Sequence, residues 1–263
     1  MRSNPLVKEA LVGLTAGGKA QLDYLGLLLL QAVVLLVWWP KSGVTQALAS
    51  QHGPNTLVAV VMAVGVSTAY VALRAGAEEF VLPGQHGLRD WALATPLALG
   101  RVVRGYLLGQ FVHSLHLLAL SAPLVLVAFT VSGGEWVALG WCVAALLVQA
   151  LFYRLCGALT HLSIGQHHGE TLFTVRTILL VIYVPVGVLA PVTSHPAFTY
   201  RALSEHLAAQ PALLGVPDRV VFLTIYAALS VLAALAVYCL LVRERRVTTD
   251  RHDGARVGEG VTS

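Results

Sequence analysis

Residues 87–97 read Gly-Leu-Arg-Asp-Trp-Ala-Leu-Ala-Thr-Pro-Leu, a polar segment between two long apolar runs. Thr95 is a favourable N-cap residue, because its hydroxyl can accept a hydrogen bond from a backbone N–H of the first helical turn. Pro96 follows it at the position where a missing N–H does no harm. The segment therefore predicts a short helix over about 88–94, an interruption, and a new helix that starts at Pro96 and enters the membrane.

The short helix is expected to carry an apolar face. Leu88, Trp91 and Ala92 stand three and four residues apart, so they share one side of a helix. Arg89 and Asp90 flank them. An apolar face held at the membrane surface between two spans favours contact with another protein, and we expect these side chains to be presented to a partner.

The composition of the whole chain is that of an integral membrane protein. Of its 263 residues, 57% are hydrophobic and 11% are charged, whereas soluble domains carry about 25% charged residues. Basic runs interleaved with aromatic residues are lacking outside the short tail, so we predict no nucleic-acid partner. Cys142, Cys156 and Cys239 stand singly in apolar runs, which favours buried thiols over disulfides or metal ligands.

The apolar runs predict an all-α membrane protein with six transmembrane helices, which together form a domain over 23–242. The expected spans cover about 24–39, 56–73, 105–131, 136–156, 174–190 and 220–242.

Three further segments lie outside these spans. Residues 1–22 are amphipathic and predict an N-terminal helix lying in the cytoplasmic interface. Residues 78–103 connect the second and third spans and contain the short helix. Residues 243–263 form a polar cytoplasmic tail, which we expect to be disordered.

The distribution of charge predicts the orientation of the chain in the membrane. Six spans place both termini on one side, and fourteen of the 17 Lys and Arg residues lie on that side. The other side carries Lys41, Arg201 and Arg219. By the positive-inside rule both termini are cytoplasmic, as in a multi-pass protein of the inner (plasma) membrane.

Residues 13–19 match the spacing of a phosphate-binding loop, Gly-x-x-x-x-Gly-Lys. The match fails at Ala20, where such a loop needs Ser or Thr to hold Mg²⁺, and no strand precedes it. Ser, His and Asp residues are scattered over both sides of the membrane, so no set of nucleophile, base and orienting group emerges. We therefore predict no enzyme activity, no cofactor and no metal site in this chain.

Two groups of histidines have more than one interpretation. Gln110, His113 and His116 recur every three residues in the third span and share one face. They could line an ion or proton pathway, or they could form ordinary hydrogen bonds between helices. His161 and the loop residues 167–170 could form a metal cluster or a solvated loop. In both cases we favour the second interpretation.

With this topology, residues 87–97 resemble the coupling segment of the type-2 ABC transporter permeases. That family joins its second and third spans by a coupling helix with the pattern Gly-Thr-Leu-Glu-Leu-Leu-Leu-x-Thr-Pro-Leu. Residues 4–9, the long outer segment before the last span and the Arg-rich end of that span are also similar to the family. Residues 81–86 depart from it, since Val-Leu-Pro-Gly-Gln-His replaces the usual Glu-Arg-Glu. The matching positions of the coupling segment are Gly87, Asp90 (at the acidic place), Leu93, Thr95, Pro96 and Leu97.

The resemblance implies a permease subunit of an ABC exporter. Such a subunit pairs with a second copy or a paralogue and binds two separate ATPase subunits, which hold ATP and Mg²⁺ and drive export from the cytoplasm. The alternative is a secondary carrier coupled to protons or metal ions through His113 and His116. The interface with the ATPase implied by the resemblance comprises Gly87, Leu88, Arg89, Asp90, Trp91, Leu93, Thr95, Pro96 and Leu97.

Overall fold

The computed structural model describes residues 6–8, 12, 18–39, 55–77, 87–132, 136–164, 177 and 218–259. The regular structure of these residues is entirely helical, as the sequence predicts. A short helix, α5 (Leu88–Ala94), lies between the second and third long helices of the chain. Within the described residues, five helices are long and apolar enough to cross a membrane: α2 (Gly18–Val37), α4 (Asn55–Gly76), α6 (Leu99–Ser132), α7 (Trp136–Ile164) and α10 (Asp218–Glu259).

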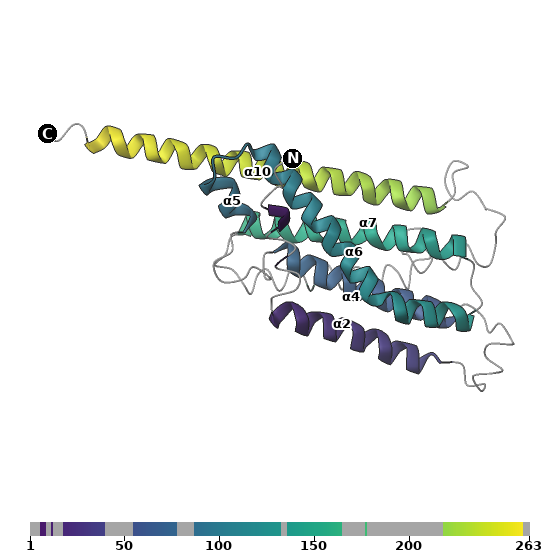
Figure 1. Ribbon diagram of the computed structural model, residues 1–263. Helices are drawn as coiled ribbons and strands as arrows, with labels where there is room; N and C mark the ends of the chain where they lie inside the picture. The colour runs from purple at the N-terminus through teal and green to yellow at the C-terminus, as the bar shows by residue number, and fades with distance from the viewer. Residues whose placement is uncertain are drawn as a thin grey trace.

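The long helices lie side by side in one bundle (Figure 1). Contacts between α2 and α6 advance together along both helices, from Tyr24–His113 to Gln31–Ser121, so these two helices run in the same direction. α4, α7 and α10 run in the opposite direction. α5 lies at one end of the bundle with the start of α6 and the ends of α4 and α7, and α10 extends past the other helices there. We call this the α5 end and the opposite one the far end.

Five of the predicted spans correspond to α2, α4, α6, α7 and α10. The predicted fifth span, 174–190, lies outside the described residues, so the six-span arrangement stays a prediction. α7 and α10 are parallel, because Phe152 contacts Tyr226 and Ala158 packs in one cluster with Val237 farther along both helices. Residues 165–217 therefore connect the α5 end to the far end.

The structure differs from the predicted boundaries at both ends of the chain. α2 begins at Gly18, so residues 18–22 belong to the first long helix and not to an interfacial segment that ends at residue 22. Before it, only residues 6–8 and 12 are described. α10 continues through residues 243–258 to Glu259, and the expected disorder of the tail stays a prediction. Glu244 in this extension is partly buried by its contact with α5.

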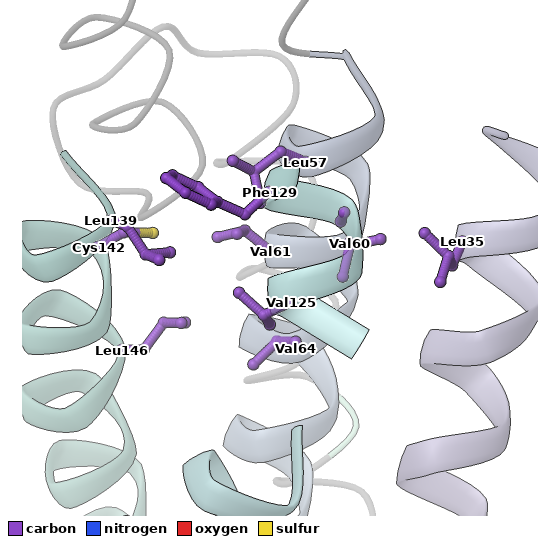
Figure 2. Close-up of a cluster of buried hydrophobic side chains, with 11 residues drawn as sticks. Leu35, Leu57, Val60, Val61, Val64, Val125, Phe129, Leu139, Cys142 and Leu146 are labelled. Carbon is purple, nitrogen blue, oxygen red and sulfur yellow. The ribbon is translucent and has the colours of Figure 1, made fainter. Parts of the chain in front are cut away.

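Apolar side chains from four helices form the core at the far end (Figure 2). Val60 and Val61 of α4 are fully buried there. The ring of Phe129 in α6 lies 4.5 Å from that of Trp136 in α7, next to the connection between these two helices. The cluster consists of Leu35, Leu57, Val60, Val61, Val64, Val125, Ala128, Phe129, Leu139, Cys142 and Leu146.

Two glycines let α4 and α7 approach closely near the α5 end. A Cβ atom on Gly76 would lie 2.0 Å from the carbonyl oxygen of Arg154, and one on Gly157 would lie 2.1 Å from that of Leu73. Small residues at helix crossings in membranes allow this backbone contact, and dispersion between the two helices then holds them together. The crossing places Arg154 beside the last turn of α4.

Candidate functional site

The predicted short helix is present as α5, and local hydrogen bonds define its first turn. The backbone of Gly87 is extended (φ −70°, ψ 174°), and its carbonyl accepts a hydrogen bond from the Trp91 N–H at 3.0 Å. The Asp90 carboxylate accepts a hydrogen bond from the Gly87 N–H at 3.3 Å. This bond satisfies a backbone donor, and it puts a negative charge at the positive end of the helix.

The prediction that the next helix starts at Pro96, with Thr95 as its N-cap, is wrong. The Thr95 hydroxyl donates to the carbonyl of Trp91, so this side chain closes the end of α5. The Thr95 backbone is extended (φ −102°, ψ 146°), which is the conformation favoured for a residue before proline. α6 begins only at Leu99. Residues 95–98 therefore form a non-helical link, which we call the hinge segment.

The apolar face of α5 points into the protein, contrary to the prediction that a partner grips it. Leu88 and Ala92 are 4% and 1% exposed, and Trp91 packs partly buried against the same residues. The exposed side of α5 carries Asp90 and Ala94. The buried cluster at this end consists of Leu6, Leu88, Ala92, Leu99, Val102, Val103, Ala158, Val237 and Leu241.

The end of α10 binds both α5 and the hinge segment. Arg245 donates from Nη1 to the carbonyl of Leu97 and from Nη2 to the carbonyl of Thr95, each over 3.2 Å. Nη2 of Arg89 lies 3.2 Å from Oε1 of Glu244. Both carbonyls belong to the non-helical link, and backbone groups there need partners from elsewhere in the structure. Arg245 supplies those partners and thereby stabilises the extended hinge segment.

The remaining residues of the expected interface differ in their exposure. They are Gly87, which is buried, Leu93 and Leu97, which are partly buried, and Pro96, which is exposed.

The predicted polar face of α6 meets α2 inside the bundle. Gln110 and His113 are each 1% exposed, and His116 is partly buried. The Tyr24 hydroxyl and Nε2 of His113 form a hydrogen bond of 3.0 Å, whose donor depends on the imidazole tautomer. The ring of His116 meets that of Tyr24 edge-on, with 5.5 Å between centroids. Both histidines thus contact α2 through one tyrosine.

Three more polar contacts join α2 to its neighbours. Asp23 Oδ1 lies 2.6 Å from Nη1 of Arg74, which forms an ion pair between α2 and α4. Two helical turns along, Gln31 Nε2 donates to Ser67 at 3.2 Å and to Ser121 at 3.0 Å. Each such bond between membrane helices contributes about 0.6 kcal/mol. The interior polar groups therefore connect α2, α4 and α6 at several levels.

His161 does not belong to a solvated loop. It lies within α7 and is 7% exposed, whereas residues 167–170 lie outside the described part of the chain. Within the described residues, no group of three or more His, Cys, Asp and Glu side chains could hold a metal ion.

Sequence reasoning missed four charged residues that lie against other helices or against the hinge segment. Asp23 and Arg154 lie inside apolar runs, and an ionisable residue in such a run signals a buried partner or a functional role. Glu244 and Arg245 have no such signal, because a charged end of a last span is common to many membrane proteins. Only their contacts with α5 and the hinge segment distinguish them.

No protein-family model, curated protein or solved structure matches the chain. A proposal for its function therefore rests on three features of this chain: α5 with the hinge segment, the contacts of Glu244 and Arg245 in α10, and the polar groups between the helices.

Proposed function

We propose that this chain is the membrane-spanning permease subunit of an ABC exporter and works with separate ATPase subunits. One observation carries the proposal: a short helix, α5, lies at one end of a bundle of apolar helices and is bound to α6 and α10. A helix in this position can receive a displacement from a partner and pass it to the long helices. The Gly87 to Leu97 resemblance to permease coupling segments agrees with this role.

The charge of the two ends supports a cytoplasmic location for α5. Among the described residues, the far end carries Arg219, while the remaining Lys and Arg residues lie toward the α5 end. The positive-inside rule then puts the α5 end in the cytoplasm, where an ATPase has access to ATP. In this proposal both termini are cytoplasmic and the membrane is the inner (plasma) membrane.

The ATPase would contact the exposed side of α5, at Asp90 and Ala94, and not its buried apolar side. Leu88 and Ala92 would transmit the displacement to α6, since they pack directly on its first turns. Arg245 would transmit it to α10 through the hinge segment. A second permease copy or a paralogue completes the transporter in this proposal, and ATP and Mg²⁺ bind only to the ATPase.

The second candidate is a secondary carrier that moves protons or metal ions past His113 and His116. The hydrogen bond between Tyr24 and His113 favours it, because it places an imidazole between two helices in the interior. The same bond also stabilises helix packing, which needs no transport role. The two candidates differ in whether transport requires an ATPase.

A site-specific photo-crosslink tests the proposal. A benzoylphenylalanine at Ala94 faces outward from α5, and one at Leu29 lies on the exposed apolar side of α2, where the side chain is 60% exposed. In native membranes, we expect the Ala94 probe to crosslink a protein that carries ATP-binding-cassette motifs and hydrolyses ATP, and we expect the Leu29 probe not to do so. Absence of such an ATPase from crosslinks at 90, 94 and 96, together with proton-driven transport by the purified chain alone, would favour the carrier.

A further inference from the structure

Arg154 of α7 is partly buried, and part of its guanidinium lacks a hydrogen-bond partner among the described residues. Its Nε and Nη1 atoms are closed off from solvent, and neither has a hydrogen-bond partner in the part of the chain that the structure describes. The guanidinium lies near the side chains of Tyr24 and Tyr106. The close crossing at Gly76 holds the backbone of Arg154 against α4, so the side chain starts from a fixed position.

Among the residues that the structure describes, an acidic group close to this cluster is already paired. Asp23 neighbours Tyr24 on α2, and its carboxylate forms the 2.6 Å ion pair with Arg74. The charges of Asp23 and Arg74 cancel, which leaves the charge of Arg154 without a counter-ion among the described residues. A buried charge without an opposite partner is strongly unfavourable, so this arrangement calls for an anion.

Gln110 of α6 is a second buried group whose side chain is incompletely bonded among the described residues. Its side chain is 1% exposed, and neither its amide nitrogen nor its amide oxygen has a hydrogen-bond partner among the residues described. It lies one turn after Tyr106 and one turn before His113 on the same face of α6. Tyr106 donates to the carbonyl of Gly76 at 3.4 Å, and His113 bonds to Tyr24. Gln110 thus lies between two residues that contact the surroundings of Arg154.

We propose that Arg154 and Gln110 bind a phosphate-type oxyanion between α6 and α7, at the α5 end of the membrane-spanning region. The guanidinium and the amide both present N–H donors, which suit phosphate oxygens. The depth of Arg154 in the membrane also suits a phosphate group, because Arg154 lies beside Gly76, where the apolar span of α4 ends. Lipid headgroups lie at this level. The oxyanion is either a free phosphate ion or the phosphate of an anionic lipid, and the site is independent of the proposed transport function.

The test uses the purified full-length chain in dodecyl maltoside, which contains no phosphate. One arm titrates sodium phosphate against sodium chloride at equal ionic strength. The other arm titrates phosphatidylglycerol against uncharged diacylglycerol in mixed micelles. Thermal unfolding and native mass spectrometry report binding. We expect saturable binding in at least one arm: phosphate binding identifies a free ion, and binding of phosphatidylglycerol alone identifies a lipid headgroup.

Three variants locate the site. We expect Arg154→Gln to bind at least tenfold more weakly than the wild type, and Gln110→Leu to bind severalfold more weakly. Arg104→Gln is the matched control, because Arg104 is an exposed arginine of α6 that bonds to its own helix at Gly100. Lack of binding by the wild type in both arms would overturn the proposal. Oxyanion binding by Gln110→Leu with the affinity of the wild type would also overturn the proposal. This variant tests the site even if Arg154→Gln does not fold.

Discussion

The guanidinium of Arg245 donates a hydrogen bond to the carbonyl of Thr95 over 3.2 Å, across 150 residues of chain. A second bond from the same side chain reaches the carbonyl of Leu97. The last long helix therefore holds the hinge segment between α5 and α6. A movement of α5 cannot leave α10 unaffected while these bonds persist.

Replacing Arg245 by Ala should loosen the hinge segment. Hydrogen bonds from a charged donor contribute about 1.5–3 kcal/mol when well formed, and partial exposure to solvent reduces this figure here. We expect faster amide hydrogen exchange over residues 95–102, with little change in α2. Arg246→Ala is the control, because Arg246 is exposed. Equal exchange in both variants would show that Arg245 does not stabilise the segment.

The pair of Arg89 and Glu244 should give a small but measurable interaction energy. Their side chains are 38% and 24% exposed, so we expect a coupling of about 0.2–1 kcal/mol, as for other solvated pairs. Arg89→Glu should destabilise the protein, and the double variant Arg89→Glu/Glu244→Arg should recover part of the loss. The coupling energy is measured by denaturing four proteins in detergent: the wild type, Arg89→Glu, Glu244→Arg and the double variant. Additive effects would contradict the predicted interaction.

The crossing of α4 and α7 should not tolerate a methyl group. In Gly157→Ala the new Cβ would lie 2.1 Å from the carbonyl of Leu73, so the helices must separate, at a cost of about 1–3 kcal/mol. Gly140→Ala is the matched control in the same helix, since nothing lies within 4 Å of its Cβ position. This control should be neutral or gain up to about 1 kcal/mol from reduced backbone freedom in the unfolded chain. The thermal unfolding temperature should fall in Gly157→Ala and should stay the same or rise in Gly140→Ala.

Removing the Tyr24 hydroxyl should separate a structural role from a transport role. Tyr24→Phe loses the hydrogen bond to His113, which we expect to cost about 0.6 kcal/mol and at most about 1.7 kcal/mol. If the chain is an ABC permease, ATP-driven transport should persist at a level set by the amount of folded protein. Loss of transport in a fully folded variant would instead favour the carrier.

The spacing of apolar residues predicted where the described helices form, but it did not predict what covers each helix face. The positions of Leu88 and Ala92 show that they share one side of a helix, but not whether a partner or the same chain covers that side. The hinge segment was misplaced for a related reason. Thr95 and Pro96 suit a helix start locally, whereas Arg245, far away in sequence, stabilises the extended backbone instead. Gln110 and His113 were recognised from their spacing, while Arg154 needed the crossing with Gly76 to stand out.

The amino-acid sequence by itself determined that the chain is a helical membrane protein with a short helix at 88–94. Apolar composition and hydrogen bonds within each segment decide these features, and both are local. Only the tertiary structure decided that the apolar face of α5 is buried, that Arg245 of α10 binds the hinge segment, and that Arg154 lies against the last turn of α4. These depend on which helices meet, and contacts between residues far apart in the chain determine that.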